Sequence, residues 1–115
     1  MKVVFDLIVQ TLKAANIAPV YALGAHQGII DGKVIVVKPS SSSQYMSFST
    51  TIQYFDIQCY GRTISEAMTL FEDVKVAMKE LEMTVMPTYL TASPYYDSNV
   101  KAWQIAGTYR NYVKN

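Results

Sequence analysis

The chain has 115 residues and a formal net charge of +1, from ten Lys and Arg against nine Asp and Glu. This length predicts a single domain, 1–115, with one modest core. The near-zero charge argues against a nucleic-acid-binding protein, which normally shows a basic patch or a high pI. One cysteine and one histidine exclude an internal disulfide and a cysteine-based zinc site, and remove most other metal sites.

Charged residues make up 17% of the chain, and it contains nine tyrosines and six methionines. Typical soluble domains carry about 25% charged residues, whereas interface cores lose charge and gain aromatic residues and Met. The composition therefore favours a chain that buries part of its surface against another protein, although a weakly charged monomer is the alternative. No apolar run approaches the ~20 residues of a membrane span, and no signal peptide is recognisable. We expect a soluble protein made in a reducing cytoplasm.

The first third of the chain is predicted to hold a helix and a strand. Apolar residues recur at helical spacing over 3–15, and Asn16 is a plausible stop signal. The glycine-containing segment 24–32 is predicted to be mostly loop. The β-branched run at 34–37 is predicted to be a strand covered on both faces, ending at Pro39.

A polar stretch, KPSSSSQYMSFS at 38–49, is predicted to be a long flexible loop. Consecutive serines favour open structure, and loops of this length tend to be functional or mobile. Apolar side chains within the stretch could order it against a partner. The candidate contact residues are Ser40, Ser41, Ser42, Ser43, Tyr45, Met46 and Phe48. The alternative is a surface loop without a role.

Residues 50–60 form the clearest predicted strand. Phe55, Ile57 and Cys59 alternate with polar residues and Tyr, so they are predicted to face inward. Ile52 falls out of phase, which suggests a bulge or an edge contact.

Residues 64–81 form the clearest predicted helix. The pair Thr63 and Glu66 has the spacing of a capping box, in which each side chain satisfies a backbone N–H at the helix start. The apolar stripe predicted to face inward comprises Ile64, Ala67, Met68, Phe71, Val74, Met78 and Leu81.

Two further strands are predicted, at 83–92 and 101–113, with a turn region at 93–100 that contains Tyr95 and Tyr96. These two tyrosines are weaker candidates for partner contact. The element order predicts an α+β fold, an antiparallel or mixed sheet with two helices packed on one face.

The sequence lacks the common catalytic motifs: no P-loop, Rossmann glycine pattern, zinc spacing or HExxH occurs. Cys59 and His26 could act as nucleophile and base. A core position is favoured for Cys59, because it lies on the apolar phase of its strand and free cysteine is among the most buried residue types. We expect no catalytic residues, no cofactor and no metal.

The tripeptide Gly61-Arg62-Thr63 precedes a helix start, where free N–H groups attract anions. Structural capping is favoured, because Thr63 and Glu66 can satisfy those groups and Glu66 would repel an anion. Arg62 stays a candidate for contact with a neighbouring chain. The aromatic residues could stack bases, but single-strand binders also need a basic groove, for which Lys and Arg are too few.

The segment YFDIQCYGRT at 54–63, running into ISEAMTLFEDVKVAMKEL at 64–81, resembles the tail-terminator proteins of long-tailed bacteriophages, often labelled minor capsid or tail-to-head joining proteins. In that family the strand often has the pattern aromatic-x-hydrophobic-x-hydrophobic-x-Gly-Arg, and the helix begins near Ser-x-Ala. The residues that match are Ile57, Cys59, Gly61, Arg62, Ser65 and Ala67. The element order resembles the family over nearly the whole chain.

The resemblance implies a structural virion protein that is not an enzyme. Such a subunit forms a ring, usually a hexamer, that caps the tail tube, ends its polymerisation and joins the tail to the head connector. Its partners would be other copies of itself, the tail-tube protein and the head–tail connector protein, with no nucleic-acid specificity and no membrane. It would be made in the host bacterial cytoplasm and reside in the virion at the head–tail junction. The alternatives are a small α+β ligand-binding or regulatory module, and an enzyme that uses Cys59.

Overall fold

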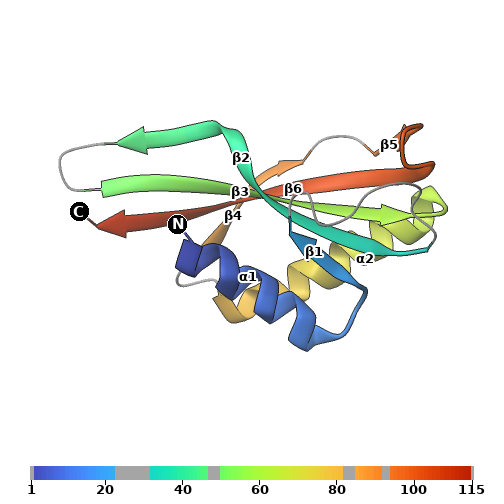
Figure 1. The fold of residues 1–115 in the computed structure, drawn as a ribbon, viewed down its shortest axis with the longest axis horizontal. Coiled ribbons are helices and arrows are strands. Elements are labelled where there is room, and N and C mark those ends of the chain that lie inside the picture. Colours follow the sequence, from blue (N-terminus) through green and yellow to red (C-terminus); the bar gives the residue numbers. More distant parts are fainter. Residues whose placement is uncertain (1, 23–31, 47–49, 82–84, 92–93, 115) are drawn as a thin grey trace.

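The computed structural model describes residues 2–22, 32–46, 50–81, 85–91 and 94–114. It shows a mixed six-stranded sheet with two helices packed against it, which confirms the predicted α+β fold (Figure 1). In sheet order the strands are β1 (Val20–Ala22), β2 (Val34–Met46), β3 (Thr50–Gly61), β6 (Ala102–Lys114) and β4 (Val85–Thr91), and β5 (Tyr95–Asp97) also pairs with β6. β1 runs parallel to β2, and the other pairs are antiparallel.

Helix α1 (Lys2–Ala15) confirms the first predicted helix. It ends at Asn16, which adopts a left-handed conformation (φ 55°) and donates its N–H to the Lys13 carbonyl at 3.1 Å. A left-handed residue at this position is a common helix terminator. Ile8 and Leu12 are fully buried and anchor α1 to the sheet.

Helix α2 (Ile64–Met78), followed by a 3₁₀ turn (Lys79–Leu81), confirms the second predicted helix. Its buried residues are Ala67, Leu70, Val74 and Met78. Ile64 and Met68, which the helical pattern placed inward, are instead 42% and 48% exposed. The buried face of α2 runs through residues 67, 70, 74 and 78, so Ile64 and Met68 lie at the margin of that face and are partly exposed to solvent.

The prediction that alternate side chains of β3 face the core is confirmed, since Phe55, Ile57 and Cys59 are at most 1% exposed. Near Ile52, where an irregularity or an edge contact was expected, β3 pairs with β6 in one continuous register over 50–61, whereas its register against β2 shifts between the partners Phe55 and Gln53. Side chains alternate between the two faces of a strand, so Ile52 lies on the face that the helices do not cover.

The predicted loop at 38–49 is wrong over most of its length. β2 does not end at Pro39 but continues to Met46, with a shift of its register against β3 between Pro39 and Gln44. A strand needs a partner backbone more than it needs apolar residues, and β3 is long enough to supply one. Pro39 is tolerated because it lies beyond the reach of β1, on a free edge next to a register shift. Residues 47–49, with Phe48, lie outside the described residues.

The turn region predicted at 93–100 contains a short strand, β5, that pairs with β6. A three-residue strand is too short to show the alternation of apolar and polar residues by which strands are recognised in a sequence. The turn follows it: Asn99 donates its N–H to the Asp97 carboxylate at 3.0 Å, and Lys101 is left-handed (φ 54°).

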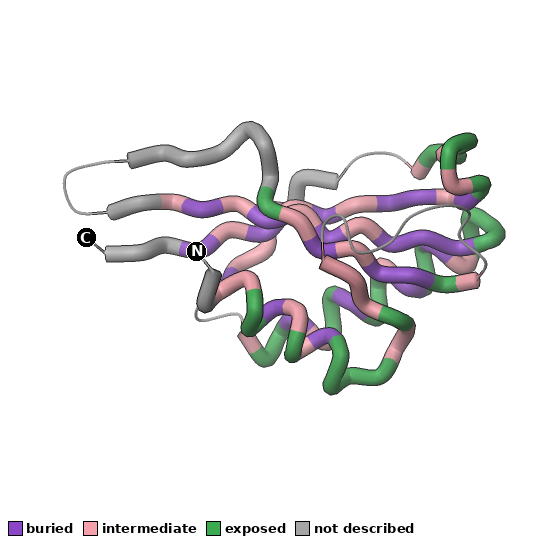
Figure 2. Tube along the Cα trace, viewed as in Figure 1, coloured by how far each residue is buried: buried purple, intermediate pink, exposed green. Residues whose placement is uncertain are grey.

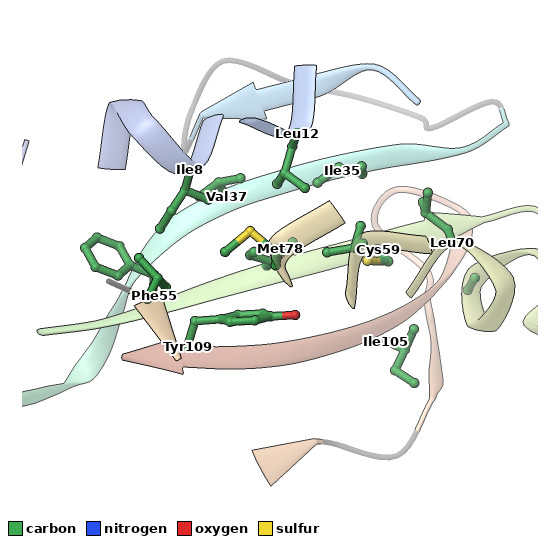
Figure 3. Close-up of a cluster of buried hydrophobic side chains, with 14 residues drawn as sticks. Ile8, Leu12, Ile35, Val37, Phe55, Cys59, Leu70, Met78, Ile105 and Tyr109 are labelled. Atoms are coloured by element: carbon green, nitrogen blue, oxygen red, sulfur yellow. The ribbon is translucent and has the colours of Figure 1, made fainter. Parts of the chain in front are cut away.

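One cluster of buried side chains lies between the two helices and the sheet (Figures 2 and 3). Its fully buried members include Ile8, Leu12, Ile35, Phe55, Ile57 and Leu70. A smaller cluster of Val34, Tyr60 and Ala102 lies apart from it. Neither helix in the described part of the chain has the length and apolar character that a bilayer-crossing segment needs.

Candidate functional site

The strand-to-helix corner is a closed structural cap. Thr63 is extended, and its Oγ1 accepts a hydrogen bond from the Glu66 N–H at 3.1 Å. Glu66 Oε1 in turn accepts one from the Arg62 N–H at 3.0 Å. The predicted cap is therefore confirmed, with the Glu66 carboxylate bonded one residue earlier than in the usual capping box. The cap satisfies the Glu66 N–H, and the negative Glu66 carboxylate next to the helix start would repel an anion.

Gly61 lets the end of β3 and the start of α2 approach each other closely. It is buried at the end of β3, and a Cβ atom there would lie 2.7 Å from the Ala67 nitrogen and 2.7 Å from the Glu66 Cβ. Glycine is needed because the first turn of α2 approaches the strand backbone this closely.

Cys59 is a core residue, as predicted. It is fully buried, and burial raises the pKa of its thiol from 9.0 to about 12. Its candidate partner His26 lies outside the described residues. A buried thiol that stays protonated at neutral pH is a poor nucleophile, because the thiolate is the reactive form.

We expect Cys59 to resist an aromatic disulfide reagent at pH 8 in the native protein and to react at once in 6 M guanidinium.

The same burial predicts a dependence of the free energy of unfolding on pH. The contribution of Cys59 to this free energy is fully present below pH 9, the pKa of the thiol in the unfolded chain. It is lost as the pH rises towards 12, because the unfolded chain releases the thiol proton more readily than the native protein does. Burial also raises the pKa of Tyr109, which acts in the same direction. Thiol titration and alkaline unfolding measure these effects; fast labelling of native protein would contradict them.

Three of the predicted contact residues, Arg62, Tyr95 and Tyr96, lie at one end of the sheet. Together with Trp103 they define what is here called the aromatic end. Trp103 pairs with Gly61 on one side and with Tyr96 on the other, so β6 brings the corner and β5 together. The Tyr96 and Trp103 rings lie edge to face, 5.8 Å apart. Tyr95 and Tyr96 are 48% and 50% exposed, so both are available to a partner.

The exposed Ile64 and Met68 extend this end onto the first turns of α2. Ile64 lies two residues after Arg62 and Met68 six residues after it. Both were missed as surface residues because their helical spacing matches the buried stripe. The cap at Thr63 marked where α2 begins, but it did not fix the rotation of the helix about its axis. Exposed apolar side chains on α2 and exposed tyrosines on β5 give this end of the sheet a composition found in interface cores.

The remaining predicted contact residues that the structure describes, 40–43, 45 and 46, belong to the opposite end of the sheet. Residues 44–46 of β2, 50–53 of β3 and 111–114 of β6 form a three-stranded ribbon, here called the arm, in which Gln44 pairs with Gln53 and Gln53 with Asn111. Figure 1 shows these strands running on beyond the first turn of α1. The arm contains Tyr45 and Met46. The four serines, 40–43, lie at the register shift where the arm begins.

The described residues hold little that resembles a chemical site. No group of three or more His, Cys, Asp and Glu side chains among them could hold a metal. A shallow hollow of about 290 Å³ between the ends of the two helices is lined by Ala15, Ile17, Asp73, Val76 and Ala77, of which Asp73 alone carries a polar side chain.

The two ends of the sheet are therefore the candidate functional surfaces, at opposite ends of a molecule whose longest extent is 44 Å. Compared with known proteins, the chain matches no family model and no curated protein sequence.

Proposed function

We propose that the chain is a structural virion protein that caps a bacteriophage tail tube as a ring, ends tube polymerisation and joins the tail to the head connector. Its partners are other copies of itself, in a hexamer, together with the tail-tube protein and the connector protein. The role requires no catalysis, no cofactor, no metal, no sequence-specific nucleic-acid contact and no membrane. It is carried out in the virion, after synthesis in the host bacterial cytoplasm.

The observation that supports this function best is the chemical difference between the two ends of the sheet. The aromatic end offers exposed Tyr95, Tyr96, Ile64 and Met68 side chains, and the arm offers strand backbone. A terminator needs one surface that matches the tube and another that does not continue it. Two unlike ends on one rigid core supply these surfaces, and head-to-tail contacts between copies close into a ring when the rotation permits.

The alternative of a small ligand-binding module gains little from the hollow between the helices. Ligand pockets are concave and place several polar groups around the ligand, whereas this hollow has one carboxylate, from Asp73, at a site where Val76 is 66% exposed. Its geometry suits an apolar contact better than an oriented small molecule.

The test is to mix the purified chain with the tail-tube protein encoded in the same genome. We expect light scattering to report the mass of a hexamer on the tube end, and electron microscopy to show tubes that stop growing. Replacing both Tyr95 and Tyr96 with serine should weaken capping at least tenfold without loss of folding, because both side chains are about half exposed.

The matched control is Val76→Ser, which also removes an exposed apolar side chain but at the far end of α2, and which should cap normally. A chain that stays monomeric in the presence of tube protein, while the tubes grow unchecked, would contradict the proposed function.

A further inference from the structure

Among the described residues, no strand pairs with the outer side of β2 or of β6 along the arm, so each side of the arm has an open strand edge there. The outer side of β2 pairs with β1 at 35–37, and no described strand continues that pairing along 44–46. On the other side, β4 begins its pairing with β6 at Asn111, so within the described residues 112–114 have β3 as their neighbour on one side and none on the other. Open edges present N–H and C=O groups that accept a further strand.

These two edges match each other in level and direction. Through β3, Gln44 lies in the same row as Asn111, and the next two residues of β2 lie level with the next two of β6. Both β2 and β6 run antiparallel to β3, so they run in the same direction. A second copy placed beside the arm would therefore bring its β6 edge parallel to, and level with, the β2 edge of the first.

Two prolines confine strand addition to the arm. Pro39 and Pro87 lie in one row of the sheet, Pro39–Phe55–Tyr109–Pro87, at its two edges, and each is followed by a register shift. Proline has no N–H to donate, and edges that carry proline and irregular register resist pairing with another chain. Within the described residues, the arm keeps a regular register on both sides of β3.

We propose that the arm joins neighbouring copies of this chain: the outer edge of β2 at 45–46 pairs in parallel with the outer edge of β6 at 112–113 of the next copy, with Tyr45 level with Tyr112 and Met46 level with Val113. The contact uses opposite sides of the arm, so it is heterologous and can close into a ring. A second copy is the fitting occupant because one chain carries both matched edges, and a net charge of +1 opposes self-association only weakly. The inference rests on the proposed function and deepens it by naming the contact that holds the ring.

Engineered cysteines test the contact directly. One variant carries Tyr45→Cys and a second carries Tyr112→Cys, the two positions that the level register brings opposite each other. Neighbouring strands lie about 4.8 Å apart, within the Cα separation that a disulfide spans. Native Cys59 does not compete, because it is buried and its pKa is about 12. Oxidation of the mixture with copper phenanthroline, under conditions where light scattering reports assembly, should give a covalent dimer of one chain of each kind.

Each variant oxidised alone should stay monomeric on a denaturing gel, and a chain carrying both substitutions should give a ladder that ends at the ring size. Tyr95→Cys mixed with Tyr112→Cys is the control, because these positions lie at opposite ends of the sheet, and it should give no dimer. A chain truncated after Asn111 should keep its melting temperature within a few degrees, since Ile105 and Tyr109 stay in the core, and should lose the assembled mass.

Efficient dimerisation of Tyr45→Cys alone would overturn the inference in favour of edge-to-edge pairing of like strands. A disulfide-free assembly that still caps tubes, or a truncated chain that still assembles, would also overturn it while leaving the proposed function intact. The mixed dimer in a chain that does not cap tubes would support the contact and would count against the proposed function instead.

Discussion

Replacing Phe55 with alanine is expected to lower the free energy of unfolding by about 3–5 kcal/mol, the usual cost of removing a buried phenylalanine ring. Phe55 is fully buried and is among the largest fully buried side chains. Its ring stacks on that of Phe5 at 6.4 Å, and its strand neighbours in the same row are Pro39 and Tyr109. α1 and the centre of the sheet therefore meet at this side chain (Figure 3).

Small domains are stable by only about 5–15 kcal/mol, so Phe55→Ala should remove a large share of the free energy of unfolding. Guanidinium unfolding, followed by the fluorescence of the single tryptophan, Trp103, measures the loss. Tyr96→Ala is the control, because it also removes an aromatic ring, but one that is 50% exposed and has an edge contact worth about 0.5–1.5 kcal/mol. Equal losses for the two variants would show that Phe55 is not a core residue.

Local signals predicted β3 and α2 well. The alternation around Phe55 and Ile57 and the cap formed by Thr63 and Glu66 depend on residues at most four positions apart, and each was found in the structure as expected. The rotation of α2 was less predictable. Ile64 and Met68 have the spacing of core residues, and only the position of the sheet beneath the helix decides that Leu70 is buried in their place.

The extent of β2 was not predictable from its own residues. The serines at 40–43 and Pro39 are typical of a loop, yet the strand continues because β3 offers partners as far as Thr51. Strand pairing depends on a backbone distant in sequence, so a polar stretch can extend a sheet wherever a partner strand is long enough.

The sequence predicted the individual contact residues but not which of them the fold brings together on one surface. Arg62 and Tyr96 are 34 positions apart in the sequence, and they come together because Trp103 pairs with strands on both sides. Likewise, Tyr45 and Met46 were singled out as side chains of a loop, whereas the structure makes them part of a strand with an open edge. The change matters for function, because an open edge gives a specific direction and register of contact that a loop does not.

Gly61→Ala is expected to destabilise the protein by about 1–3 kcal/mol, the usual cost of overpacking a closed site. The added Cβ would lie 2.7 Å from the Ala67 nitrogen, which is backbone and cannot rotate away. The first turn of α2 cannot retreat cheaply either, because the Thr63 and Glu66 cap holds it and the Ala67 side chain is fully buried. The substitution should separate the strand from the helix at the corner and lower the melting temperature.

Gly107→Ala is the matched control for this effect. Its added Cβ would meet the Phe71 ring at 2.8 Å, but that ring belongs to a half-buried side chain that can turn aside. Both substitutions reduce the entropy of the unfolded chain equally, so the difference between their unfolding free energies reports the contacts alone. We expect Gly61→Ala to be the less stable of the two by at least about 1 kcal/mol. Equal stabilities would mean that the corner yields as easily as a side chain, and that the glycine is not required by the close approach of α2.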